Sequence, residues 1–119
     1  MDRLNTIQKK EKLNEVYRMG EQGPGGAYHD YMVTSKEKGP ILLLVEFQKG
    51  PRNHPDSRQG VLDCDLLEIV RDRLKAFQRG TMPTMETEEA LHHIEQALVF
   101  MNKRVEDRIN RKVLGTMEK

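Results

Sequence analysis

The sequence is poor in the residues that mark a redox, metal or membrane protein. It has one cysteine, Cys64, so a single chain can form neither a disulfide nor a thiolate metal site. Its longest apolar run, Ile41 to Val45, is far too short to span a bilayer. The first residues also lack the apolar stretch of a signal peptide. We therefore expect a soluble protein of the cytosol.

An excess of charge of either sign is also missing. Twenty basic residues stand against nineteen acidic ones, which gives a formal net charge of +1. This balance offers no general electrostatic reason for DNA binding, so any site for an anion must be local. Charged residues still make up 33% of the chain and hydrophobic residues only 36%. Such a ratio favours exposed helical faces or a core that is completed by a second subunit.

The 119 residues correspond to a single domain, residues 1–119, because domains commonly hold roughly 100–200 residues. We expect residues 1–26 to form an N-terminal arm or a short helix, since their apolar residues have only a weak helical period. A glycine-rich cluster at 20–26 ends this segment. Two strands are predicted next, at 28–34 and 41–48, because the linker between them is polar and short, as a hairpin requires.

The second predicted strand is apolar on both faces through Val45, so we expect either the helices or a second subunit on each face. The loop at 50–60 follows it and carries Arg52 and Arg58 among turn-forming residues. Loops that leave a rigid strand often hold ligands, although a solvated connector explains this composition equally well. Residues 27–60 are thus interpreted as β-strands and a ligand loop.

Residues 61–119 are predicted to form a helical hairpin, because two segments carry apolar residues at spacings of three and four. Asp63 or Asp65 can cap the first helix, and Thr84 is the expected N-cap of the second. A hairpin cannot bury both apolar stripes by itself, so the sheet, a partner chain or both must cover them. The fold class is therefore α+β, with a small N-terminal β-sheet portion packed with a C-terminal antiparallel two-helix hairpin.

Three residues of the helices stand out chemically. Arg104 and Arg108 are four positions apart on one helix, so both guanidinium groups lie on the same face and can each grip phosphate oxygens. Ion pairs with Glu106, with Asp107 or with acids of the other helix explain them as well. Phe77 closes the apolar stripe of the first helix and can stack on a purine, but most such residues belong to a core.

Signals of catalysis are missing. The sequence has no glycine-rich phosphate loop and no nucleophile elbow. His92 and His93 are adjacent and face different directions, so they do not form a metal site. We therefore predict no cofactor, no metal and no catalytic residue, which favours a binding protein over an enzyme.

Four runs together resemble a known family. They are YHDYMV, FQKGPR, LLEIVRDRLKAFQRG and ETEEALHHIEQALVFMNKRVEDRINRKVLGT, and they extend over residues 28–116. In order and spacing they are similar to the first type of phage Thoeris anti-defence protein, whose helical hairpin is shared with an anti-CBASS sponge. The resemblance implies a non-enzymatic sponge that binds glycocyclic ADP-ribose and related cyclic ADP-ribose signals without cleaving them, and so blocks Thoeris immunity.

The resemblance also implies a ligand-binding set. The family's arginine after the Gly-Pro pair matches Arg52, and the stacking aromatic of its FQ-x-G segment matches Phe77. The two arginines of its R-x-x-x-R step match Arg104 and Arg108. Where the family often has a hydrogen-bonding asparagine, this chain has Thr87, whose single hydroxyl offers fewer bonds than an amide.

The family further implies a homo-oligomer, from a dimer to a hexamer, with ligand sites near subunit boundaries. Some relatives bind cyclic oligonucleotides at a second site, which this sequence does not locate. No nucleic-acid or membrane partner is expected, and the place of action is the cytoplasm of the infected bacterial host. Two other functions stay open: a hydrolase of the signal nucleotide, and a small phage DNA-binding or regulatory protein.

Overall fold

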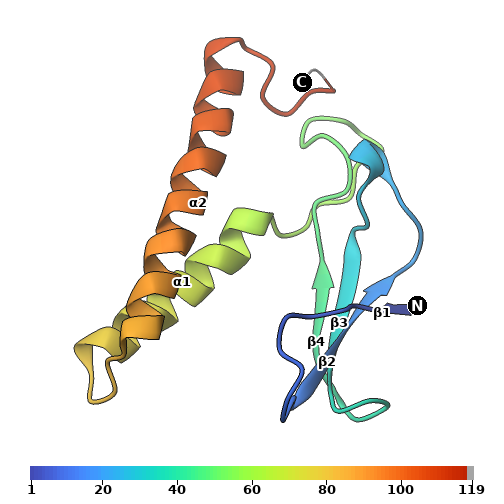
Figure 1. The fold of residues 1–119 in the computed structure, drawn as a ribbon. Helices are drawn as coiled ribbons and strands as arrows, with labels where there is room; N and C mark the ends of the chain where they lie inside the picture. Colours follow the sequence, from blue (N-terminus) through green and yellow to red (C-terminus); the bar gives the residue numbers. More distant parts are fainter. Residues whose placement is uncertain (118–119) are drawn as a thin grey trace. The chain divides into compact units, whose positions relative to one another are not determined.

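The computed structural model describes residues 1–117 as two compact units (Figure 1). The first is Met1–Val61 and the second begins at Leu62. Each is described by itself below. The prediction that they act as a single domain stays a prediction.

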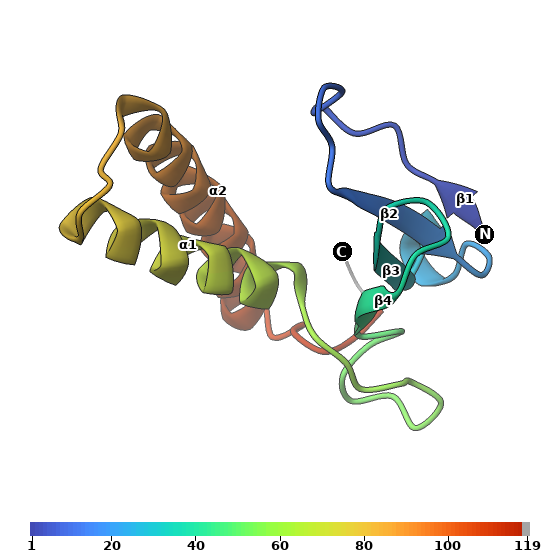
Figure 2. The same ribbon diagram turned by 90° about the horizontal axis from the view of Figure 1, so that it is seen from below.

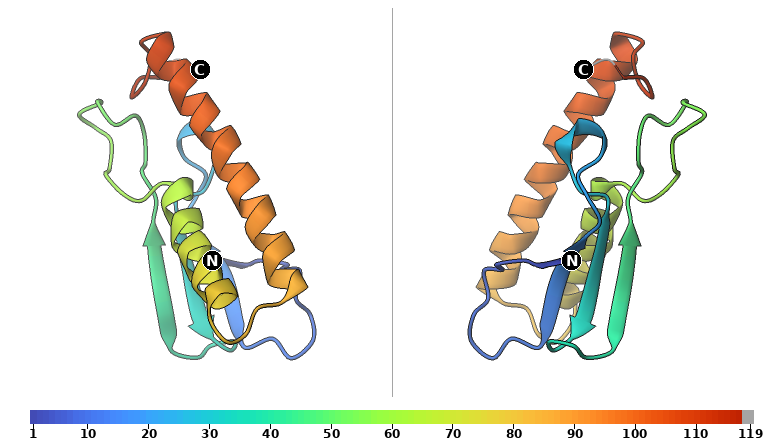
Figure 3. Two further views of the ribbon diagram at one scale, coloured as in Figure 1. Left: turned by 90° about the vertical axis from the view of Figure 1, so that its left-hand side faces the viewer. Right: turned by 90° about the vertical axis from the view of Figure 1, so that its right-hand side faces the viewer.

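The first unit is an antiparallel sheet of four strands in the order β1-β2-β3-β4. Figure 3 shows β2, β3 and β4 side by side. Each strand pairs with the next one along the chain, so the connections are simple turns and loops. The strands are β1 (Asp2–Arg3), β2 (Asn14–Met19), β3 (Asp30–Ser35) and β4 (Ile41–Glu46), with a short 3₁₀ turn, η1 (Pro24–Gly26), between β2 and β3.

The two predicted strands are present as β3 and β4, and their hairpin is confirmed by a register that pairs Met32 with Leu44. The prediction of a helix or arm in residues 1–26 is wrong for β2. This strand pairs along its whole length with β3, from Asn14 opposite Ser35 to Met19 opposite Asp30. The weak helical period of these residues does not produce a helix, because a neighbouring strand supplies hydrogen-bond partners for the N–H and C=O groups of every second residue.

The sheet has a small core. Tyr17 and Met32 lie directly opposite each other on β2 and β3, and each is only 8% exposed. Val45 on β4 is buried to the same extent. By contrast, the apolar residues 41–44 of β4 are 48–58% exposed. The packing expected on both faces of this strand is therefore not supplied by the sheet unit, and it stays a prediction.

The second unit consists of α1 (Asp63–Arg79) and α2 (Met85–Asn110), which lie side by side as a hairpin (Figures 1 and 2). The predicted N-cap Thr84 is confirmed, whereas the N-cap of α1 is Leu62 and not Asp63 or Asp65, since Asp65 is the third residue of this helix. Asp65 accepts a hydrogen bond from the Leu62 N–H at 2.8 Å, and Thr84 Oγ1 accepts one from the Thr87 N–H at 3.0 Å. The α+β class, with a sheet followed by two packed helices, is confirmed as well.

The interface between the helices is partly apolar and partly ionic. Leu91 is buried, and Arg71 donates through Nε to Glu95 at 2.8 Å and through Nη1 to Glu68 at 3.2 Å. The hydrogen bond to Glu95, followed by the one to Glu68, raises the pKa of Arg71. Farther along α2, Phe100 is 64% exposed. The hairpin therefore leaves part of its apolar surface uncovered, as the sequence predicts.

Candidate functional site

The segment after β4 is a closed loop that carries Arg52. Its ends, Lys49 and Arg58, exchange two backbone hydrogen bonds of 2.9 and 2.8 Å. Gly50 has φ +88°, and a Cβ at this position would lie 2.5 Å from Ser57 Oγ, so the turn favours glycine. Arg52 lies on the exposed part of the loop, and its guanidinium makes no hydrogen bond or ion pair with another described residue.

The guanidinium of Arg58 fixes the base of this loop. Its Nη2 donates to the carbonyl oxygens of His29 at 3.2 Å and Phe47 at 3.0 Å. Its Nη1 forms an ion pair of 3.0 Å with Asp30. The same loop therefore holds one arginine that is bonded to neighbouring strands and one that is exposed.

Phe77 and Thr87 both lie near the turn between the helices. Phe77 is 46% exposed, and the Arg73 guanidinium lies 5.4 Å from the centre of its ring. The hydroxyl of Thr87 accepts a hydrogen bond of 2.9 Å from Thr84 Oγ1. This exposure argues against a purely core role for Phe77 within this unit, and it leaves aromatic surface for stacking.

Gln78 holds the turn between the two helices in place. Its side-chain amide donates to the Thr84 carbonyl at 3.1 Å and to Glu88 at 3.0 Å, and its oxygen accepts from the Thr84 N–H at 3.1 Å. The residue next to Phe77 thus bonds the first turn of α2, where Thr87 lies.

Arg104 and Arg108, near the end of α2, differ in their surroundings. Arg104 is exposed and makes no hydrogen bond or ion pair with another described residue. Arg108 is only 7% exposed, and its Nη2 donates to the carbonyl oxygens of Val113 at 3.0 Å and Thr116 at 3.1 Å. The spacing of four residues predicts that both guanidinium groups lie on one face of α2. The guanidinium of Arg108, however, is hydrogen-bonded to the turn that follows the helix.

The acids that could have paired with Arg104 have other partners. Asp107 forms an ion pair of 2.9 Å with Arg111, and Glu106 accepts a hydrogen bond of 3.1 Å from Asn102. The charge of Arg104 is therefore available to a ligand.

The structure does not gather the sequence-predicted residues into one pocket of a single hairpin. Thr87 and Arg104 are seventeen positions apart on α2. At about 1.5 Å per residue, the helix separates them by about 25 Å. Arg52 belongs to the other unit of the chain. Phe77 with Thr87, and Arg104 with Arg108, are thus two separate parts of the candidate site.

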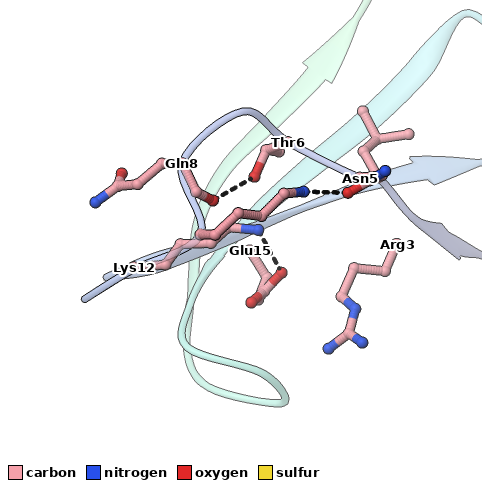
Figure 4. Close-up of a pocket in the computed structure, with 8 residues that line it drawn as sticks. Arg3, Asn5, Thr6, Gln8, Lys12 and Glu15 are labelled. Carbon is pink, nitrogen blue, oxygen red and sulfur yellow. Dashed lines mark hydrogen bonds and ion pairs between the residues drawn. The ribbon is translucent and has the colours of Figure 1, made fainter.

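A hollow of about 380 Å³ in the sheet unit is lined by polar side chains and by Leu4 (Figure 4). Its three cationic residues already have partners. Lys9 bonds Asn5, Lys12 forms an ion pair of 3.0 Å with Glu15, and the third, Arg3, pairs with Glu37 at 3.1 Å. This hollow contains none of the five sequence-predicted residues. Its satisfied polar groups give it no clear ligand.

A second hollow, of about 470 Å³, lies along the two helices. Glu68, Glu95 and Glu106 line it, together with only two cations, Arg71 and Lys103. Repulsion from three carboxylates disfavours a polyanionic ligand here. The helical face that bears Arg104, which pairs with no described residue, is a better candidate for a phosphate site.

The sequence does not reveal the structural roles of two residues. Arg58 holds the base of the loop, and Gln78 holds the turn between the helices. The sequence marks Arg58 only as a charge among turn formers. Its main partners are backbone carbonyls, which carry no sequence signal, so the pattern could not have revealed its role.

Within residues 1–117, no group of three or more histidine, cysteine, aspartate or glutamate side chains could hold a metal ion. In the same part of the chain, neither helix has the length and apolar character that are needed to cross a membrane.

Known proteins share both the hairpin and most of the chain. Residues 44–106, more than half of the sequence, match the family described as Acb2/Tad1, hairpin domain. The protein named Thoeris anti-defense 1, from Bacillus phage SBSphiJ7, is 37% identical over 97 residues. That match covers 82% of this chain and 66% of the relative, just under two thirds of the relative's own length. The chain therefore belongs to the Acb2/Tad1 hairpin family and is a homologue of Thoeris anti-defense 1.

Proposed function

We propose that this protein binds and sequesters cyclic ADP-ribose-type signals, glycocyclic ADP-ribose in particular, without cleaving them, and thereby blocks Thoeris immunity. The observation that carries the proposal is the 37% identity to a protein named for anti-defence against Thoeris, over 82% of this chain. The proposed place of action is the cytoplasm of the infected host, where the signal is made.

The exposed residues suit the chemistry of that ligand. Its pyrophosphate needs guanidinium donors, and Arg52 and Arg104 are exposed and unpaired among the described residues. Its adenine needs a flat surface, and Phe77 is an aromatic residue that is 46% exposed. Its ribose hydroxyls need small polar partners such as Thr87. Arg108 can join them if it exchanges its carbonyl partners for phosphate oxygens.

The separation along α2 favours a site that is shared between copies of the chain. A ligand of nucleotide size cannot contact Thr87 and Arg104 of one helix, which lie about 25 Å apart. A second copy could bring its arginine end next to the turn end of the first. The exposed side chains of Val99, Phe100 and Ile109 on α2 offer apolar area for such an assembly. We therefore include a homo-oligomer in the proposal.

One experiment tests the proposal and separates binding from cleavage. Purified protein is mixed with glycocyclic ADP-ribose, free ligand is removed by filtration, and the retained complex is heat-denatured. Mass spectrometry then identifies what is released. We expect the intact nucleotide. A cleaved product would establish a hydrolase instead, and no released nucleotide would overturn the proposal.

A matched control shows whether the retained ligand occupies the proposed residues. The double variant Arg52→Ala/Arg104→Ala should retain no ligand under the same conditions. Equal retention by this variant would place the ligand elsewhere on the protein.

A further inference from the structure

We infer that Arg58 is a positioning residue of the ligand site, which acts by holding the loop of residues 49–58 so that Arg52 is presented in a fixed place. This inference rests on the proposed function, because Arg52 is a ligand contact only there. Arg58 itself is directed toward the strands and is not proposed to contact the ligand.

The first argument is the closure of the loop. Lys49 and Arg58 exchange backbone hydrogen bonds of 2.9 and 2.8 Å, so the two ends are fixed side by side. Within the loop, His54 N–H donates to the Pro51 carbonyl and Ser57 N–H donates to the His54 carbonyl, each at 3.1 Å. The backbone around Arg52 is thus a compact turn structure on a closed base.

The second argument is how the side chain of Arg58 ties this base to the sheet. It donates to carbonyls of two segments, at His29 just before β3 and at Phe47 just after β4. Its ion pair of 3.0 Å with Asp30 adds a charged bond to the first residue of β3. The side chain of Arg58 is 34% exposed, so these bonds are partly shielded from water.

Together these contacts explain why a loop can hold a ligand-binding arginine. A long side chain on a mobile loop loses much conformational freedom when it binds, and that loss weakens affinity. A loop that is already ordered at its base loses less. Arg58 therefore supports the affinity that Arg52 provides, although its own charge is used within the protein.

A double-mutant cycle on the full-length protein tests this role. The affinity for glycocyclic ADP-ribose is measured by calorimetry for wild type, Arg52→Ala, Arg58→Ala and the double variant. We expect Arg58→Ala to weaken binding about tenfold when Arg52 is present and by less than twofold when Arg52 is absent. An equal loss in both backgrounds, or no loss at all, would overturn the inference.

Arg18→Ala is the matched control. Arg18 is also a partly buried arginine of the sheet unit, with an ion pair of 3.4 Å to Asp2 and with its guanidinium carbon 4.4 Å from the centre of the Tyr28 ring. It makes no hydrogen bond or ion pair with a described residue of the loop. The Arg18→Ala variant should lower the stability of the sheet without changing the affinity for glycocyclic ADP-ribose. A matching drop in affinity would mean that general destabilisation, and not the loop, explains the effect of Arg58→Ala.

Hydrogen exchange of residues 50–57 without ligand gives an independent readout. Arg58→Ala should speed exchange in this segment at least tenfold, whereas Arg18→Ala should leave it as in wild type. Unchanged exchange in Arg58→Ala would overturn the inference even if the wild-type protein binds. A different result is that the wild-type protein does not bind the nucleotide while exchange is fast in Arg58→Ala. That result would overturn the proposed function and the role of Arg58 in binding. It would still establish that Arg58 holds the loop.

Discussion

The loop after β4 and the end of α2 each contain two arginines with opposite surroundings. In the loop, Arg52 is exposed and Arg58 donates to two backbone carbonyls. In the helix, Arg104 is exposed and Arg108 donates to two backbone carbonyls. In both regions, one arginine is exposed and can bind an anion, and a second arginine nearby in the sequence is hydrogen-bonded to backbone carbonyls.

The two regions differ in how far along the chain their bonds reach. The carbonyl partners of Arg58 lie 29 and 11 positions away, so this residue joins the loop to segments beside two strands. Those of Arg108 lie only 5 and 8 positions away, in the turn after the helix. Bonds within a local turn open at lower cost than bonds that join strands. Arg108 can therefore be released to a ligand more readily than Arg58.

The largest effect is expected when both exposed arginines are removed. A hydrogen bond to a charged group contributes about 1.5–3 kcal/mol, which corresponds to roughly 10- to 150-fold in affinity for each residue. Arg52→Ala/Arg104→Ala should then weaken ligand binding by about 100-fold or more, with stability changed by less than about 0.5 kcal/mol. Calorimetry and urea unfolding measure the two quantities.

A control for this double variant removes the same charge from the same two units. Arg3→Ala/Arg79→Ala also takes one exposed arginine from each unit and should bind within about twofold of wild type. If it lost as much affinity, attraction by overall charge would explain the result better than contacts at Arg52 and Arg104.

The next effect separates the exposed arginine of the helix from the buried one. Arg108→Ala should lower both affinity and stability, because it leaves the carbonyls of Val113 and Thr116 without this donor. The expected loss of stability is about 1–3 kcal/mol. Arg104→Ala should lower affinity alone, since no described residue depends on its guanidinium.

Circular dichroism and hydrogen exchange measure this difference. The helical signal should persist in both variants, because Arg108 lies in the last turn of α2, whereas exchange of residues 113–116 should speed up only in Arg108→Ala. If Arg108→Ala and Arg104→Ala were equally stable, the bonds of Arg108 would contribute little, and the contrast between the two arginines would fail.

The comparison also shows what the sequence can and cannot predict. The spacing of Arg104 and Arg108 correctly places both on α2, and Thr84 is recognisable as an N-cap because its side chain bonds within three residues. Burial of Arg108 depends on the path of the chain after the helix, which no periodicity encodes. The strand β2 is missed for a related reason, since its pairing with β3 is a long-range choice.

A smaller effect is expected at the turn of the hairpin. Phe77→Leu removes a flat ring but keeps an apolar side chain at a position that is 46% exposed. Stacking of one base is worth about 1–3 kcal/mol, so affinity should fall at least about fivefold, with little change in stability. Phe77→Tyr keeps the ring and should bind within about twofold of wild type. Equal binding by all three proteins would show that the ring does not touch the ligand.

The smallest effect is expected at Thr87, whose hydroxyl accepts a bond from Thr84 Oγ1 and keeps its own proton for a further partner. Thr87→Asn supplies an amide that both donates and accepts. One added hydrogen bond contributes about 0.5–1.5 kcal/mol net, so affinity should rise about two- to tenfold. Stability should stay within about 0.5 kcal/mol, because threonine and asparagine have similar helix propensities. Calorimetry at matched salt concentration would measure the gain. Unchanged affinity would mean that this end of the hairpin contacts the ligand through Phe77 alone.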